Sequence, residues 1–414
     1  MTPRRLEVLR AAVLDPVDGS RTPERRILVE DDRIVAVLGP GDPAPEAFEA
    51  ATRVDAAGRV VVPGFIDAHV HLLGYESDLG VPGRESPLYV AARAGDLMGA
   101  MLRRGFTTVR DVGGADHGLV RAVEEGYLAG PRIFHGGPAL SQTGGHGDFR
   151  GAGEVCAHSA STALPTIGLV ADGVPAVRAA VRNEIRRGAR HIKLMLGGGI
   201  ASPTDRIDSA QFAEEEIRAA VEEARNAGIY VTGHAYTPAA IARALRLGVR
   251  CIEHGTLLDD ETAGLFVEND AFLVPTLAIG TLLASEESAE FGVPEESRRK
   301  AEGIRAAGTE MLRIARDRGV QVVFGTDFIG PMHRFQSREF AVRAEVLPAL
   351  DILRSATVTA ARLLGEEGEL GRIAEGYLAD LLVLDVDPLE DIAALAEPER
   401  SVATVISRGR VVEG

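Results

Sequence analysis

The sequence predicts an α/β protein whose central unit is a (β/α)8 TIM barrel, and three observations lead to this prediction. An amphipathic helix, a glycine and an apolar strand follow one another repeatedly between residues 62 and 372. The strands are continuous apolar runs, which is typical of parallel strands that are covered on both faces. Residues 1–61 and 373–414 do not follow this repeat and contain short strands and turns. Eight alternating units imply a closed parallel barrel, with a small β-sandwich domain formed from both termini.

Five repeats are clear, and in each the helix is predicted to stop at a glycine. These glycines are Gly105, Gly188, Gly228, Gly248 and Gly319. Ser209 and Thr237 are predicted to cap the third and fourth of these helices, and Pro238 suits a first helical position. Three more strands complete the eight, at residues 62–71, 131–137 and 271–277.

The remaining segments predict one loop and the second domain. Residues 141–175 follow the third strand and are rich in Gly, Ser and Thr, so we expect a long functional loop there. Near the N-terminus, RRILVEDDRIVAVL predicts a hairpin that turns at Asp31 and Asp32, and near the C-terminus ADLLVLD and ATVISRGRVVEG predict strands. We therefore expect a β-sandwich domain of residues 1–61 and 373–414 beside a barrel of residues 62–372.

Composition and charge exclude several classes of partner. The chain has 45 Lys and Arg against 61 Asp and Glu, a formal net charge of −16, which repels nucleic acid and anionic membranes. No apolar run reaches the ~18 residues that a membrane span requires. The two cysteines, Cys156 and Cys251, form no disulfide or metal pattern, which is typical of a reducing compartment. We expect a cytoplasmic protein that binds neither nucleic acid nor a membrane.

Polar residues end most of the predicted barrel strands, where barrel enzymes carry their active sites. They are His69, His71, Asp111, Lys193, His234, His254 and Asp327. His69 and His71 are two apart on one strand, so both imidazoles face the barrel mouth. His234 and His254 end consecutive strands and are therefore neighbours. The first pair alone is a weak motif that also occurs by chance, and the second is also compatible with buried, hydrogen-bonded histidines. Four of ten histidines at strand ends favour a metal site.

Lys193 and Asp327 add two further candidate ligands. Lys193 lies inside the apolar stretch HIKLM, where a lysine either reaches outward between helices or is buried with a lowered pKa. A buried free amine can capture carbon dioxide as a carbamate, whose two oxygens can bridge two metal ions. Asp327 in FGTD suits a turn or a helix cap, but its place after the eighth strand favours a metal ligand or general base.

At these residues the chain resembles the amidohydrolase superfamily. The stretch PGFIDAHVH (63–71) is similar to that family's first-strand signature, and the other candidate ligands follow in the family's order. GRIAEGYLADLLVLDVDPL (371–389) resembles its β-sandwich segment. The stretches SQTGGHGD (141–148) and KLMLGGGIASPTDRID (193–208) resemble the imidazolonepropionase-like and prolidase-like branch. Leu-Gly-Gly-Gly at 196–199 departs from the Ala-Ser-Gly-Gly that is usual in the prolidase-like members.

The resemblance implies a hydrolase of carbon–nitrogen bonds with two divalent metal ions, most often zinc. One ion would be held by His69, His71, Asp327 and carbamylated Lys193, and the other by Lys193, His234 and His254. A hydroxide between the ions would attack the carbonyl carbon of an amide, and Asp327 would move the proton to the leaving nitrogen.

Five residues are candidates for substrate binding. His146 lies in the glycine-rich stretch after the third strand and Tyr236 follows His234, so both are expected to contact the substrate and assist catalysis. Arg206, His333 and Arg338 follow the fourth and eighth strands, where an arginine could bind a carboxylate with two hydrogen bonds. For each of these five, a structural role or a solvated charge is the alternative interpretation.

Three hypotheses of function follow. The first is hydrolysis of a linear amide, such as an Xaa-Pro dipeptide or an N-acyl amino acid. The second is hydrolysis of a cyclic amide, a carbamate or a urea. The third is a metal-free scaffold used for assembly, which the sequence disfavours because all six ligand positions are filled. A small-molecule amide is the expected partner, and the sequence leaves the oligomeric state open, a homo-oligomer included.

Overall fold

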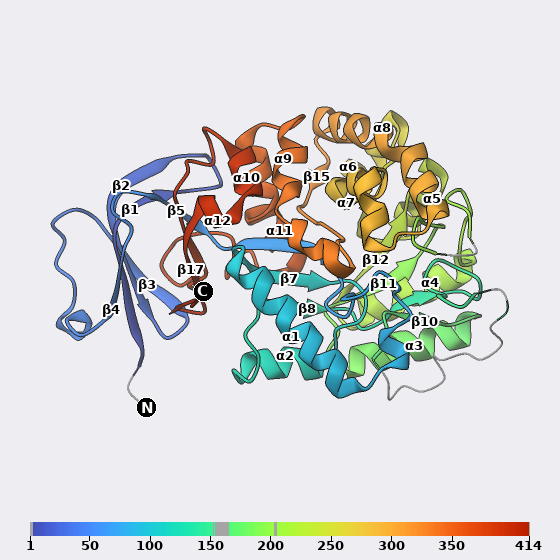
Figure 1. Cartoon of the computed structure of the whole chain (residues 1–414), viewed down its shortest axis with the longest axis horizontal. Coiled ribbons are helices and arrows are strands. Elements are labelled where there is room, and N and C mark those ends of the chain that lie inside the picture. The colour runs from blue at the N-terminus through green and yellow to red at the C-terminus, as the bar shows by residue number, and fades with distance from the viewer. Residues whose placement is uncertain (1–2, 152, 154–164, 203–204, 414) are drawn as a thin grey trace.

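The computed structural model describes residues 3–151, 153, 165–202 and 205–413. Figure 1 shows two parts: a β-rich part where the blue start and the red end of the chain meet, and a larger part of strands surrounded by helices. Cys156 and a section of the predicted loop at 141–175 lie outside the described residues. Within the described residues, no helix has the length and the apolar character needed to cross a membrane.

The larger part is the predicted parallel barrel. Its strands are β6 (Phe65–Val70), β7 (Phe106–Asp111), β8 (Arg132–His135), β11 (His191–Met195), β12 (Tyr230–Ala235), β13 (Cys251–His254), β14 (Phe272–Val274) and β15 (Gln321–Val322). Two further strands, β9 (Ala139–Ser141) and β10 (Gly168–Val170), follow β8 in the chain. Strand β9 pairs in parallel with both β10 and β11. The Ala68 N–H donates to the Phe324 carbonyl at 2.9 Å, which joins the last strand to the first. The fold class predicted from the sequence is therefore confirmed.

Helices surround the barrel, and the five whose ends the sequence predicts stop one or two residues before their glycines. The helices are α1 (Pro87–Arg103), α2 (His117–Glu124), α3 (Val174–Arg186), α4 (Glu214–Asn226), α5 (Pro238–Arg246), α6 (Asp260–Glu268), α7 (Leu277–Leu283), α8 (Glu295–Arg318), α9 (Arg338–Ala344), α10 (Ala349–Ser355), α11 (Val358–Leu364) and α12 (Pro398–Ser401). All five predicted stop glycines have positive φ, from 72° at Gly228 to 93° at Gly105, a conformation that glycine adopts without strain.

The predicted caps have different outcomes. Thr237 caps α5, because its side chain accepts a hydrogen bond from the Ala240 N–H, and Pro238 is the first helical residue. The prediction for Ser209 is wrong. Helix α4 begins only at Glu214, after Ala213, and the Glu216 carboxylate accepts the Ala213 N–H instead. The intervening residues belong to the loop that follows β11.

The second part is a mixed β-sheet built from both ends of the chain, here called the terminal sheet. Its strands are β1 (Arg5–Leu14), β2 (Arg21–Glu30), β3 (Arg33–Leu38), β4 (Thr52–Asp55), β5 (Val60–Pro63), β16 (Leu381–Leu384), β17 (Val402–Ser407) and β18 (Arg410–Val411). Strands β2 and β3 form the predicted hairpin. Strand β5 joins the two ends of the chain, because it pairs in parallel with β1 and antiparallel with β16.

The stretch 62–71, predicted as one strand, is divided between the two parts. Strand β5 ends at Pro63 in the terminal sheet, and β6 begins at Phe65 in the barrel. A Cβ on Gly64 would lie 2.0 Å from the Thr107 Oγ1, so only glycine permits this close passage. Strand β5 therefore crosses the boundary at residues 61 and 62 that the sequence predicts between the domains.

Candidate metal centre and active site

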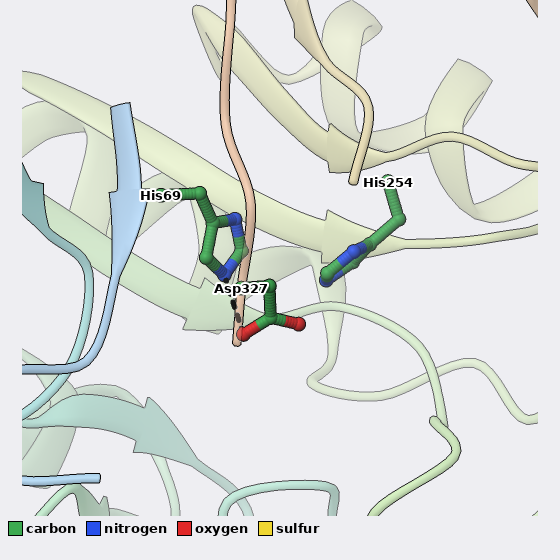
Figure 2. A group of neighbouring side chains, drawn as sticks. All are labelled: His69, His254 and Asp327. Carbon is green, nitrogen blue, oxygen red and sulfur yellow. Dashed lines mark ion pairs between the residues drawn. The ribbon is translucent and has the colours of Figure 1, made fainter. Parts of the chain in front are cut away.

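The C-terminal ends of the barrel strands bring the predicted ligands to one cavity. The cavity is lined by all six of them: His69, His71, Lys193, His234, His254 and Asp327. Figure 2 shows His69 from the first barrel strand, His254 from the end of β13 and Asp327 from the segment after β15, all directed toward one another. One ligand atom from each of these three lies within 4.8 Å of the others, a spacing that a single metal ion could span.

His69 and His71 approach the same carboxylate. The Nε2 atom of each imidazole lies 3.3 Å from the Asp327 Oδ1. Burial alone would raise the pKa of Asp327, but the charges of His69 and His71 and their hydrogen bonds hold that pKa well below its usual range. Asp327 is therefore an ionised carboxylate, the form that binds metal and accepts protons.

The Nδ1 atoms of these histidines are held by neighbouring residues. The His69 Nδ1 bonds with the Glu253 carboxylate at 2.8 Å, and the His71 Nδ1 bonds with the Gly113 carbonyl at 2.9 Å. Both partners can only accept, so each Nδ1 carries a proton, and each Nε2 is the nitrogen that faces Asp327. Such fixed rings are typical of metal-ligating histidines.

His234 and His254 lie side by side, with ring centroids 4.5 Å apart. The His254 Nδ1 bonds with the Thr276 Oγ1 at 2.8 Å, which leaves Nε2 free. The His234 Nε2 donates to the Gly198 carbonyl at 3.1 Å, so Nδ1 is the nitrogen that remains available. The two rings therefore offer different nitrogens, a distinction that strand-end position alone does not predict.

Lys193 is the buried amine that the sequence predicts as a carbamylation site. Its side chain is 1% exposed, and the Nζ has no hydrogen-bond partner among the described residues. Burial lowers the pKa of Lys193 to about 8, although the charges of Glu253 and Asp327 oppose this shift. An unpartnered buried amine is costly in a folded protein. Its position among four histidines and a carboxylate fits a pair of divalent metal ions.

Two buried residues that the sequence analysis did not select, Glu253 and Arg110, hold the candidate ligand His69 in place. Glu253 receives the His69 Nδ1–H and also bonds with Arg110, whose guanidinium NH2 lies 2.6 Å from Oε1. Burial alone would raise the pKa of Glu253, but Arg110, Lys193 and His69 hold it well below its usual range. Nothing in the sequence around Arg110 distinguishes it from an outward-facing arginine on a strand.

Asp111, also noted at a strand end, has a structural role. Its carboxylate accepts the backbone N–H groups of Leu72, Gly113 and Ala115 at 2.6–3.0 Å. These contacts order the loops that follow β6 and β7. Asp111 does not line the cavity.

Of the five predicted substrate residues, His146 and Tyr236 line the cavity. The His146 ring stacks on His234 with centroids 4.2 Å apart, and burial lowers the pKa of His146 to about 4. Tyr236 lies beside both His234 and His254, with ring centroids 5.0 and 5.1 Å away. Burial raises the pKa of Tyr236, so its phenol keeps the proton and can donate a hydrogen bond.

The other three predicted substrate residues do not line the cavity. Arg206 points to solvent and pairs with Asp208, with side chains 83% and 62% exposed. His333 is buried, and its Nε2 bonds with the Gly74 carbonyl at 3.0 Å, so the ring fixes a loop. Arg338 lies over the Phe335 ring, 3.7 Å from its centroid, and also approaches Glu287. Their positions in loops near the barrel mouth did not bring them into the site, because each has a partner elsewhere.

The long connection from β14 to β15 supplies a wall that the sequence analysis missed. Helices α7 and α8 line the cavity mainly with apolar side chains, among them Ile279, Leu283 and Ile304. Arg305 lies on the same wall and is the one arginine among the described lining residues. It makes no hydrogen bond or ion pair within the described part of the chain, so its guanidinium is free to bind an anion.

The departure at residues 196–199 does not change the cavity lining. Leu196 is buried in the core and packs against Gly233, where a Cβ would lie 2.4 Å from the leucine Cδ1. Neither Leu196 nor Gly197 lines the cavity, whereas Met195 and Ile200 on either side of this stretch do.

Comparison with known proteins agrees with this geometry. A model of the amidohydrolase family matches residues 60–412. A crystal structure of a prolidase in complex with N-methylphosphonate-L-proline is 46% identical, covers 99% of each chain and has a TM-score of 0.93. A crystal structure of a Xaa-Pro dipeptidase with bound methionine is 32% identical over 99% of this chain and 100% of that chain, with a TM-score of 0.86.

A relative of another name is also similar along nearly the whole chain. Ochratoxinase from Aspergillus niger is 32% identical over 423 aligned positions, which cover 99% of this chain and 87% of that protein. The family model spans the barrel and strands β5, β16, β17 and β18 of the terminal sheet, and it includes every candidate ligand. The chain belongs to the amidohydrolase family and is a hydrolase acting on carbon–nitrogen bonds.

Proposed function

We propose that this chain hydrolyses the amide bond of a dipeptide or an N-acyl amino acid with the help of two zinc ions. The observation that carries the proposal is the convergence of four histidines, one ionised carboxylate and one unpartnered buried lysine on a single cavity. His69, His71 and Asp327 would hold one ion and His234 and His254 the other. Lys193, as a carbamate, would link them.

Bound divalent metal polarises a carbonyl and lowers the pKa of water from 15.7 to about 7. The residues of the chain supply the rest of the proposed chemistry. Asp327 accepts a proton from the attacking water and returns it to the leaving nitrogen. Tyr236 and His146 orient the substrate, and the apolar wall from α7 and α8 keeps bulk water away.

Support for a substrate with a free carboxylate comes from two directions. The prolidase and the Xaa-Pro dipeptidase described above were crystallised with a proline derivative and an amino acid. In this chain, Arg305 provides a cation on the cavity wall that has no ion-pair partner among the described residues, and a carboxylate could bind there. A cyclic amide, carbamate or urea without a carboxylate would leave this cation unused, so we place these substrates second.

A combined metal and substrate assay tests the proposal. Purified protein would be analysed for metal content and then assayed for amine release from dipeptides, N-acyl amino acids, cyclic amides, carbamates and ureas. We expect two zinc ions per chain and the highest kcat/KM with a linear amide that carries a carboxylate. Protein that holds two metal ions but prefers a carbamate or urea would contradict the substrate class. Protein that hydrolyses amides without metal would contradict the proposed centre.

A further inference from the structure

Behind His146, three segments that are far apart in the sequence meet in one buried hydrogen-bond network. His146 comes from the loop after β9, Ser202 and Asp205 come from the loop after β11, and Lys300 comes from α8. The first three of these residues are at most 9% exposed. A buried polar network whose donors and acceptors are hydrogen-bonded holds its side chains in one orientation.

The network begins at the His146 ring. Its Nδ1 lies 2.8 Å from the Ser202 Oγ, and the Ser202 hydroxyl also bonds with the Asp205 carboxylate. The second Asp205 oxygen accepts the Gln211 Nε2 at 2.8 Å, and the Gln211 Oε1 accepts the His146 backbone N–H at 2.8 Å. The chain of contacts therefore closes on His146 itself and fixes both its ring and its backbone.

The direction of these hydrogen bonds assigns the imidazole proton. Ser202 has one hydroxyl proton, and its neighbours Asp205 and the Gly199 carbonyl, at 3.4 Å, can only accept it. The Ser202 oxygen must then accept a hydrogen from the His146 Nδ1. The His146 Nε2 makes no hydrogen bond within the described residues, and it belongs to the ring that lines the cavity.

Lys300 attaches this network to α8. Its Nζ donates to the carbonyls of Gly199, Ser202 and Asp205 at 3.3, 3.1 and 2.9 Å, and it lies 4.0 Å from the Asp205 Oδ1. Glycine is required at 199, because a Cβ there would lie 2.1 Å from the His146 Cε1. The backbone of this loop thus packs directly against the imidazole that it orients.

We propose that Asp205 and Lys300 are positioning residues, which hold His146 with its proton on Nδ1 so that Nε2 is the nitrogen offered to the substrate. Asp205 orients the His146 ring through Ser202. Lys300 holds the loop that carries Ser202 and Asp205, because it binds the three backbone carbonyls of that loop. The inference concerns the same cavity and rests on the proposed function for its kinetic readout only.

Nitrogen NMR of ¹⁵N-histidine-labelled, zinc-loaded protein tests the proton assignment without any substrate. The His146 signals would be assigned by their loss in His146→Gln. We expect a protonated Nδ1 and an unprotonated Nε2 in the unchanged protein. In Asp205→Asn the new carboxamide can donate to Ser202, which frees the serine proton for Nδ1, so the tautomer should move toward Nε2–H. Ser202→Ala removes the same link and serves if Asp205→Asn does not fold.

The kinetic readout compares variants at equal zinc content. Asp205→Asn should lower kcat/KM for an amide substrate about tenfold or more, because a displaced catalytic contact costs that much. Lys300→Met should lower kcat/KM and raise hydrogen–deuterium exchange across residues 197–202 and 205–211. Arg299→Met is the matched control, because Arg299 is the neighbouring α8 cation and pairs with exposed Glu295. It should leave both readouts unchanged.

Two results would overturn the inference. One is a His146 tautomer that stays the same in both Asp205→Asn and Ser202→Ala, with kcat/KM within twofold of the unchanged protein. The other is an equal effect of Lys300→Met and Arg299→Met on exchange across residues 197–202 and 205–211. Failure of the amide-hydrolysis proposal is distinguishable, since it leaves no amide turnover to compare but does not affect the NMR or exchange results.

Discussion

Arg110 and Glu253 form an ion pair inside the barrel with both side chains fully buried, whereas Arg59 and Asp385 form one on the terminal sheet with side chains 43% and 41% exposed. The donor–acceptor distance is 2.6 Å in both pairs. Removing two charges from water costs several kcal/mol per ion, while an exposed pair costs and contributes little. The two ion pairs therefore have the same donor–acceptor distance but differ in the free-energy cost of removing their charges from water.

The difference indicates why the barrel keeps its buried charges. Glu253 is bonded to His69, and Lys193 lies near enough for Glu253 to influence its pKa. In the described part of the terminal sheet most charged side chains form pairs at the surface, and the buried Glu7 pairs with Arg26 and Arg53, whose side chains still reach solvent. The buried charges of Glu253 and Lys193 thus lie among the candidate metal ligands.

The strongest test removes the lysine from the centre of this buried set. Lys193→Ala is expected to lose both metal and activity, with kcat/KM reduced at least about a thousandfold, since a metal site contributes several kcal/mol to the transition state. Asp327→Asn is the contrast and should retain much of the metal while losing turnover. Metal analysis and steady-state kinetics measure both. Two ions still bound to Lys193→Ala would exclude its bridging role.

Breaking the buried ion pair tests whether it affects the free energy of unfolding more than the exposed pair does. Arg110→Met leaves Glu253 buried without its main countercharge, so we expect a loss of about 3–5 kcal/mol in the free energy of unfolding. The double variant Arg110→Met/Glu253→Leu removes both charges and should cost less than the single variant. Denaturant unfolding at constant metal content is the measurement. A single variant as stable as the unchanged protein would show that the pair is not effectively buried.

Arg305 tests whether an arginine without an ion-pair partner among the described residues binds the carboxylate of the substrate. Arg305→Met should lower kcat/KM about tenfold for an N-acyl amino acid, because one charged hydrogen bond contributes about 1.5 kcal/mol. The same variant should have little effect on the corresponding carboxamide. Arg313→Met is the control, since Arg313 lies on the same helix and pairs with Glu310. Equal losses for the acid and the carboxamide would contradict carboxylate binding.

A buried histidine in the barrel wall predicts a pH dependence. Burial lowers the pKa of His135 to about 4, and its Nδ1 has no described partner. Between about pH 6.5 and 4 the unfolded chain binds this proton and the folded chain does not, so stability falls as the pH drops. From pH 7 to pH 5, His135→Gln should lose about 2 kcal/mol less stability than the unchanged protein. His117→Gln, at an exposed histidine, should show no such difference.

The smallest expected effect lies on the terminal sheet. Arg59→Ala should change the free energy of unfolding by less than about 1 kcal/mol, because water screens its pair with Asp385. The change should shrink further at high salt. A loss near that of Arg110→Met would remove the contrast between the two regions.

The sequence predicted the features that depend on local pattern. Alternation on a strand placed His69 and His71 on one face, and the glycines at 105, 188, 228, 248 and 319 ended their helices as expected. The division of 62–71 between two sheets was missed because Val60–Pro63 and Phe65–Val70 follow one another as one mainly apolar run, and the pairing of β5 with β1 and β16 separates them.

The parts of the site that the sequence did not predict depend on distant partners. Arg206 and Arg338 seemed suited to bind a carboxylate, but Asp208 and the Phe335 ring engage them outside the cavity. Arg305 lies in a helix with several other exposed cations, and its place on the cavity wall follows from how α8 packs. Which arginine of a chain is left unpaired is a property of the folded molecule.

The pairing of β5 with β16 has a consequence for the order of assembly. Val60–Pro63 is made before the barrel, and its partner Leu381–Leu384 is made after it. During synthesis β5 is therefore an open edge that stays without this neighbour until the barrel has been translated. Such edges favour association between chains. A chain stalled before β16 should be more prone to aggregate than one that has been released complete.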